Sequence, residues 1–161
     1  MLFRSALYYY YYYCGSGRSG LFFTTNNLAL AADTFHSLGG FDESFPFPAG
    51  EDREFSDRCA EHGVPLIYAS EAVMRHFRDL TLGAFLRQHF TYGRGAVHFH
   101  RARLRRGLGR VVIEPRFYGL LLRMPFARHG IRGVPLALLV TLSQVAYAAG
   151  FAREEAASWR R

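Results

Sequence analysis

The sequence predicts an α/β chain in which short strands alternate with amphipathic helices. A mostly apolar run over residues 21–30 is typical of a buried strand, and shorter extended segments are expected at 66–69 and 72–77. Apolar residues recur at helical spacing within 51–62 and 81–97. Half of the 161 residues are hydrophobic, which is enough for one domain with a real core.

The first twenty residues are expected to be the remnant of a helix followed by a linker. Residues 1–13 are apolar and aromatic and end in six consecutive tyrosines, whereas 14–20 are rich in glycine and serine. The segment lacks the basic start, apolar centre and small-residue cleavage site of a secretory signal. The two cysteines, Cys14 and Cys59, lie far apart, which suits a reducing compartment.

Polar residues and glycines follow the predicted first strand. Asn26 and Asn27 interrupt its apolar run, and the residues alone indicate a turn at the strand end. A short helix is expected over 34–38. It would stop at Gly39, and the Gly39–Gly40 pair predicts a turn with positive φ.

Two adjacent carboxylates, Glu51 and Asp52, open the next predicted helix directly after Gly50. A helix N-terminus carries roughly half a positive charge, so these carboxylates are predicted to stay ionised. Gly50 allows a ligand to approach the backbone closely. The arrangement suits a general base, although acidic residues are also common in first helical turns as plain caps.

Charge is segregated along the chain. Nine acidic residues and two arginines lie between Asp33 and Glu71, whereas thirteen arginines and two acidic residues lie between Arg75 and Arg132. The basic run at 98–110 indicates either a solvated face or contact with anionic lipid headgroups. It carries no neighbouring stacking aromatics or recognisable motif, so nucleic-acid binding is not expected.

The C-terminal region is expected to be a basic and apolar helical arm over residues 98–161. Within it, Val134 to Ala152 contains no charged residue, and a membrane span needs about 20 apolar residues. A helix in the membrane interface, or one packed on the protein, remains an alternative because the stretch also holds polar side chains.

Four stretches together resemble a known family. TTNNLAL, GGFDESF, GEDREFSDR and AVMRH are similar, in order and spacing, to the second half of the catalytic domain of family 2 glycosyltransferases. Those enzymes have a GT-A fold and use nucleotide sugars. The resemblance covers roughly Leu21 to Ala96. It implies a partial GT-A-type mixed sheet with flanking helices over 21–97, followed by a helical, membrane-proximal arm.

The resemblance also implies roles for individual residues. Asp52 would be the catalytic base that deprotonates the acceptor hydroxyl, and Glu51 would shape the loop or touch the donor. His76 would help bind Mg²⁺ or Mn²⁺, although the DxD pair that usually completes this site is absent from the sequence. The candidate substrate-binding residues are Asn26, Asn27, Gly39, Gly40, Glu51, Gln88 and Arg94.

The resulting hypothesis is an inverting glycosyltransferase that moves a sugar from a nucleotide-sugar donor to a hydroxyl of a glycan or lipid-linked acceptor. It would work in the cytoplasm, peripheral to or anchored at the inner face of the membrane. The nucleotide-binding half that precedes this region in the family is expected to be missing, so the chain would be truncated. The alternatives are a catalytically inactive fragment and a basic, membrane-associated interaction module.

Overall fold

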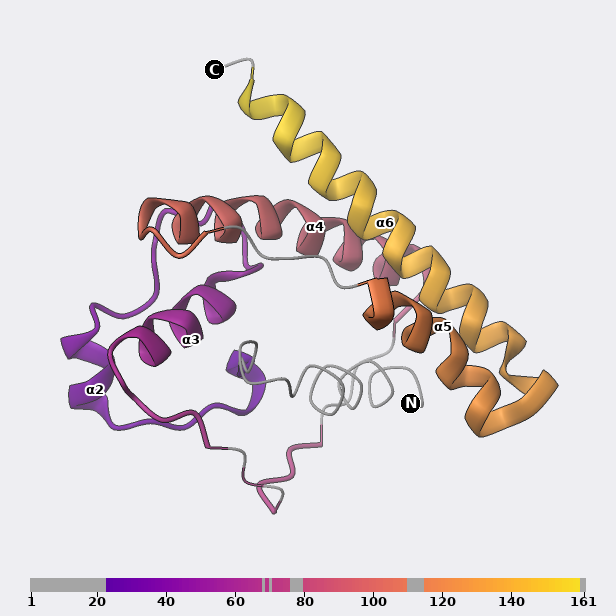
Figure 1. Ribbon diagram of the computed structural model, residues 1–161, viewed down its shortest axis with the longest axis horizontal. Coiled ribbons are helices and arrows are strands. Elements are labelled where there is room, and N and C mark those ends of the chain that lie inside the picture. Colours follow the sequence, from indigo (N-terminus) through magenta and orange to yellow (C-terminus); the bar gives the residue numbers. More distant parts are fainter. Residues whose placement is uncertain (1–22, 68, 70, 76–79, 110–114, 160–161) are drawn as a thin grey trace.

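The computed structural model describes residues 23–67, 69, 71–75, 80–109 and 115–159 (Figure 1). Most of these residues are helical. The elements, in chain order, are η1 (Thr25–Asn27), α2 (Ala32–Ser37), α3 (Glu51–Glu61), α4 (Leu82–Arg105), α5 (Pro115–His129), η2 (Gly130–Gly133) and α6 (Val134–Ser158).

The prediction of an α/β fold with a partial GT-A-type mixed sheet is wrong for the described residues, because none of them forms a strand. The expected strand at 21–30 is η1 flanked by extended backbone, and the described parts of 64–75 are irregular. The two segments meet where Asn27 Nδ2 donates a hydrogen bond of 2.6 Å to the carbonyl of Ala72. A strand needs a neighbouring backbone to pair with, and apolar content alone does not supply one.

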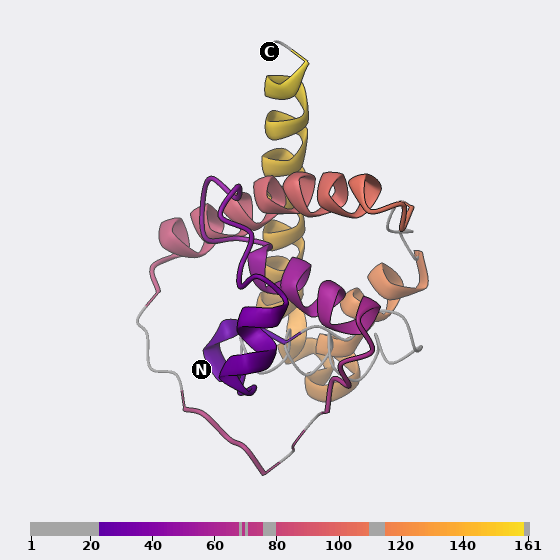
Figure 2. The ribbon, with the colours of Figure 1, turned by 90° about the vertical axis from the view of Figure 1, so that its left-hand side faces the viewer.

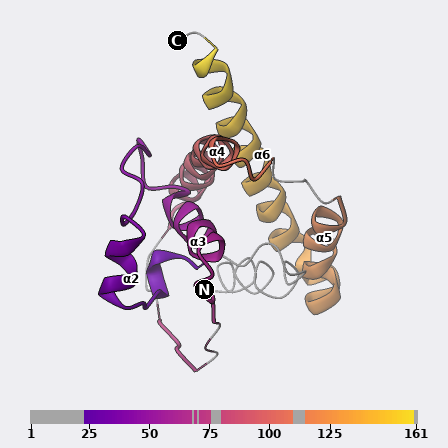
Figure 3. The same ribbon diagram turned by 60° about the vertical axis from the view of Figure 1, so that its left-hand side comes forward.

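The predicted helix at 51–62 is confirmed as α3, which ends at Glu61. Three acidic residues in its first turn complement the partial positive charge of the helix N-terminus. Phe55 and Cys59 are buried on one face, and the Phe55 ring lies 5.4 Å from Phe35 and 5.1 Å from Phe41. These contacts place α3 between α2 and α4 (Figure 3).

The helix predicted at 81–97 is longer than expected and continues to Arg105. Thr81 caps it by accepting a hydrogen bond of 3.2 Å from the backbone N–H of Ala84. Gly93 and Gly95 lie inside the helix and do not end it. Each allows a close contact with the backbone of another segment. A Cβ at Gly93 would overlap the Tyr147 carbonyl of α6, and one at Gly95 would overlap the Ala49 carbonyl.

The packing of α6 against α4 is the most extensive between helices in the described part of the chain, and Figure 2 shows the two crossing. The contact is reciprocal, since a Cβ at Gly150 of α6 would overlap the Phe90 carbonyl of α4. Only glycine permits two backbones to lie this close.

Replacing Gly93 by alanine is therefore expected to destabilise the protein by about 2 kcal/mol, because the added methyl group must push α4 and α6 apart. Gly83, in the first turn of the same helix, has open space where a Cβ would lie. The matched variant Gly83→Ala is expected to be neutral or to stabilise by up to about 1 kcal/mol through helix propensity. Thermal unfolding followed by circular dichroism compares the two. Equal shifts in both variants would contradict the packing argument.

Three arginines of the basic run, Arg101, Arg103 and Arg106, have partners within the fold. Arg106 pairs with Glu54, Asp57 and Glu61 of α3, and Arg103 pairs with Asp57. Arg101 lies 3.1 Å from Glu155 of α6. The run therefore joins α4 to the acidic helix α3 and to α6. A solvated face and a lipid-contacting face stay predictions for the run, and these three arginines also have ion pairs within the fold.

α5 and α6 form a hairpin through η2, with a small core of Leu121 and Val140. By length and composition, the stretch from Tyr118 to Ser158 is the one in the described residues that is apolar enough to cross a membrane. Much of its apolar surface is exposed, and the largest examples on α6 are Leu138 and Val145, each 60% exposed.

Candidate functional site

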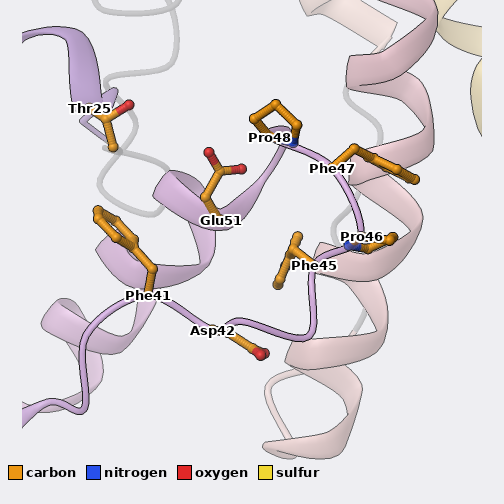
Figure 4. A pocket seen from close by; sticks show the side chains of 8 residues that line it. All are labelled: Thr25, Phe41, Asp42, Phe45, Pro46, Phe47, Pro48 and Glu51. Carbon is orange, nitrogen blue, oxygen red and sulfur yellow. The ribbon is translucent and has the colours of Figure 1, made fainter.

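An open hollow of about 360 Å³ lies between the start of α3 and the loop that precedes it (Figure 4). Its wall combines phenyl rings and prolines with two carboxylates, and none of the lining residues is a cation. The lining residues are Thr25, Phe41, Asp42, Phe45, Pro46, Phe47, Pro48 and Glu51.

The loop is held against α4 by backbone contact and by its aromatic rings. A Cβ at Gly50, which has a φ of 96°, would lie 3.0 Å from the carbonyl oxygen of Gly95. The Phe47 ring centroid is 5.5 Å from that of His98 and 4.2 Å from the guanidinium carbon of Arg94. Gly50 is also the N-cap of α3, so these contacts fix the position of the helix start, which carries Glu51 and Asp52.

Glu51 lies at the rim of the hollow, and Figure 4 shows its carboxylate between Thr25 and Pro48. Its Oε2 atom is buried and has no hydrogen-bond partner among the described residues. Burial, with a further contribution from the neighbouring charge of Asp52, raises the pKa of the Glu51 carboxyl. Because Glu51 also lines the hollow, its carboxylate is a candidate to accept a hydrogen bond from a ligand hydroxyl.

Asp52 lies next to Glu51 but is not among the residues that line the hollow, and it interacts with the backbone of Thr25 in η1. Its Oδ1 accepts a hydrogen bond of 2.8 Å from the backbone N–H of Arg53. Burial raises the pKa of the Asp52 carboxyl, and the backbone N–H groups of Arg53 and Thr25 lower it by less. The net direction is upward, which makes Asp52 a stronger base than an ordinary aspartate.

The other predicted site residues near the start of the chain lie around this hollow without lining it. Asn26 and Asn27 belong to η1, directly after Thr25, and the Asn27 side chain is bonded to Ala72. Gly39 and Gly40 have positive φ values of 82° and 68°, which confirms the predicted turn.

Gly39 lines a second hollow of about 280 Å³ between α3 and α4. The carbonyls of Leu38 and Gly40 accept hydrogen bonds from the two terminal nitrogens of Arg58. Arg58 therefore anchors the turn to α3, and the turn leads directly into Phe41 and Asp42 of the loop.

The predicted residues on α4 are engaged with other side chains. Gln88 donates to the hydroxyl of Tyr92, and Arg94 Nε lies 2.7 Å from Glu154 of α6. Neither lines the hollow. His76 falls outside the described residues. Elsewhere in the described chain, no group of three His, Cys, Asp or Glu side chains could hold a metal ion, so those residues alone do not fit a Mg²⁺ or Mn²⁺ site.

Sequence reasoning missed three features of the site. The rings of Phe41, Phe45 and Phe47 line the hollow. Arg58 of α3 holds the glycine turn, and Glu154 of α6 holds Arg94 of α4. The alternation of Phe and Pro over 45–48 was the available signal for the rings, because prolines stiffen a loop and limit how its neighbours pack.

Comparison with known proteins identifies the family. The model of the family described as "Glycosyl transferase family group 2" matches residues 2–152. Two curated relatives are validoxylamine A glucosyltransferases, from Streptomyces hygroscopicus subsp. jinggangensis (strain 5008) and subsp. limoneus. Each is 42% identical over 52 residues, which is 32% of this chain and 12% of the relative. No solved structure matches the chain. Because the family model covers nearly the whole chain, the protein belongs to glycosyl transferase family group 2.

Proposed function

We propose that this protein is the acceptor-side part of an inverting glycosyltransferase that moves a sugar from a nucleotide-sugar donor to a hydroxyl. Family membership supports sugar transfer as the reaction. The observation that carries the proposal is the Glu51–Asp52 pair at the start of α3, in which both carboxyls have a raised pKa and Glu51 lines an open hollow. The Glu51–Asp52 pair would supply the base that a single-displacement mechanism needs.

In the proposed reaction, Asp52 accepts the proton of the acceptor hydroxyl while the oxygen attacks the anomeric carbon of the donor sugar. The bond from that carbon to the nucleotide diphosphate breaks on the opposite face, which inverts the configuration. A base with a raised pKa takes this proton more readily. The chain's own contribution is to place and desolvate the base next to the acceptor.

The lining of the hollow favours the acceptor as its occupant over the donor diphosphate. Phe41, Phe45 and Phe47 present apolar rings on which the C–H faces of a sugar can rest. Glu51 and Asp42 can accept hydrogen bonds from its hydroxyls, whereas they would repel a diphosphate. We therefore propose a neutral glycan or the glycan end of a lipid-linked molecule as the acceptor.

The function is tested by incubating the protein with a panel of radiolabelled nucleotide sugars and a panel of free and lipid-linked glycans. Formation of a product with inverted anomeric configuration, identified by nuclear magnetic resonance, would support the proposal. The absence of transfer or donor hydrolysis with every donor would count against an active enzyme and favour the inactive-fragment hypothesis.

The divalent cation remains a prediction that is tied to His76. Calorimetry with Mn²⁺ and uridine, guanosine and thymidine diphosphates measures whether the chain binds a nucleotide diphosphate. If His76 is a metal ligand, His76→Ala is expected to weaken Mn²⁺-dependent binding by at least about tenfold, as loss of a supporting group at a metal site does. His62→Ala, on the exposed C-cap of α3, is the matched control. Equal binding by both variants would remove His76 from the site.

We further propose that α5 and α6 bring the site to the cytoplasmic face of a membrane. Exposed apolar side chains occupy both helices, among them Leu122 and Phe126 on α5 and Leu138, Leu142 and Val145 on α6. Such a surface is favourable in lipid and costly in water. Because Arg101, Arg103 and Arg106 are paired internally, the apolar surface is the stronger candidate for the membrane contact.

Vesicle flotation is expected to show binding that persists at 1 M salt, since apolar contacts are not screened. The double variant Leu138→Glu/Val145→Glu is expected to lower the bound fraction by at least about tenfold, because each buried aliphatic side chain contributes about 1.5–3 kcal/mol. Ile67→Glu is the control, because Ile67 is 75% exposed but lies outside both helices. Loss of binding in high salt would instead identify arginines as the driver.

A further inference from the structure

We infer that Glu154 of α6 is a positioning residue for the loop over residues 41–50, which it orders through Arg94 and His98 of α4. The inference deepens the proposed function, because it takes the hollow beside Glu51 as the acceptor site. It assigns to α6 a role in the site that neither the family match nor the membrane proposal gives it.

One carboxylate orients two side chains of α4. Glu154 Oε2 lies 2.7 Å from Arg94 Nε, and Glu154 Oε1 lies 3.1 Å from His98 Nε2. The Glu154 side chain is only 14% exposed. Hydrogen bonds with ionised partners are shorter and stronger than neutral ones, so both α4 side chains have restricted positions. The hydrogen bonds from Arg94 and His98 also lower the pKa of Glu154, against the effect of its burial.

The two oriented side chains form the surface on which the loop lies. The guanidinium carbon of Arg94 is 4.2 Å from the centroid of the Phe47 ring. The His98 ring is 5.5 Å from Phe47 and 6.1 Å from Phe45, measured between centroids. Phe45 and Phe47 also line the hollow. A continuous set of contacts therefore runs from α6 through α4 to the wall of the hollow.

The next residue along α6 provides a natural comparison. Glu155 lies 3.1 Å from Arg101, and Arg101 also donates to Ser158 of α6. This pair joins the same two helices, but the ring contacts to Phe45 and Phe47 come from Arg94 and His98. Glu154 and Glu155 therefore carry the same charge in the same helix pair, while only Glu154 acts on the loop.

The test compares Glu154→Gln with Glu155→Gln by hydrogen exchange measured with mass spectrometry. Glu154→Gln is expected to speed exchange in peptides covering 41–50 by about fivefold, the factor that corresponds to the loss of one ordinary interaction. Glu155→Gln is expected to leave those peptides unchanged. No change in Glu154→Gln, or equal changes in both variants, would overturn the inference.

A second variant separates a loosened loop from a loosened helix pair. Arg94→Lys keeps a positive charge near Glu154 but removes the planar group over Phe47. It is expected to speed exchange in 41–50 while peptides of α6 keep their protection. Unchanged exchange in 41–50 would overturn the inference even if Glu154→Gln unfolds.

The kinetic readout depends on the proposed function, whereas the exchange readout does not. Where transfer is measurable, Glu154→Gln is expected to raise the acceptor KM several-fold with a smaller effect on kcat and on the donor KM, and Glu154→Asp is expected to restore part of it. Faster exchange without any measurable transfer would contradict the proposed function and leave the coupling intact. Transfer with an unchanged acceptor KM and unchanged exchange would overturn the coupling alone.

Discussion

Replacing Asp52 by asparagine is expected to lower sugar transfer by about two to four orders of magnitude, the usual contribution of a general base. Asparagine keeps the shape of the side chain but cannot take the acceptor proton. The loss is expected in kcat, because the base acts on bound acceptor. Initial rates with saturating donor and acceptor measure it.

The same variant is expected to be at least as stable as the parent chain at pH 7. Burial raises the folded-state pKa of Asp52 above its ordinary value of 3.8. The folded state therefore favours the protonated form, so the free energy of unfolding falls as the pH rises from the ordinary pKa to the folded pKa, and it stays lower at higher pH. Asparagine has no charge to bury, so its advantage should appear at neutral pH and vanish below about pH 3, where both states are protonated.

Two further variants make this result specific. Asp33→Asn removes an exposed carboxylate in the first turn of α2 and is expected to leave transfer unchanged. Glu51→Gln tests the neighbour that lines the hollow and is expected to raise the acceptor KM more than it lowers kcat. Normal turnover by Asp52→Asn would show that Asp52 is not the base. A Tm below that of the parent at pH 7 would show that its hydrogen bonds outweigh its burial.

The helices were predictable because their signals are local. The spacing of Phe55 and Cys59 and the acidic first turn predict α3 correctly, and the glycines at 39 and 40 predict the turn with positive φ. The end of α4 was not predictable in the same way. Glycines at 93 and 95 usually indicate a helix end, but here each is required by a close backbone contact with a distant segment.

The sheet and the charges of the site depend on partners far along the chain. Apolar runs at 21–30 and 66–77 match strands in composition, but the described residues of these segments form no strand, and a side-chain hydrogen bond joins them. The raised pKa of Asp52 has burial as its largest cause, and burial is a tertiary property. The segregation of acids from arginines predicted a solvated face or contact with anionic lipid, and it did not reveal that Arg106 would pair with α3.

The largest loss of stability is expected for Arg58→Ala, at about 3–5 kcal/mol, which is typical of breaking a buried ion pair. Arg58 Nε lies 2.9 Å and 3.0 Å from the two carboxylate oxygens of Glu54, which is only 2% exposed. Its terminal nitrogens donate to the carbonyls of Leu38 and Gly40. The variant leaves a buried carboxylate with Arg106 as its ion-pair partner and removes these two hydrogen bonds from the glycine turn. Urea unfolding followed by circular dichroism measures the loss.

Arg105→Ala is the matched control, because Arg105 is 63% exposed and lies 3.9 Å from Asp42, so its removal should change stability by less than about 0.5 kcal/mol. Arg58→Lys is expected to fall between the two, since an ammonium group cannot reach a carboxylate and two carbonyls as a planar fork does.

The turn held by Arg58 leads directly into Phe41 and Asp42 of the hollow. The Arg58 variants should therefore also weaken acceptor binding at temperatures where they remain folded. Equal stability of Arg58→Ala and Arg105→Ala would mean that Arg106 alone satisfies Glu54.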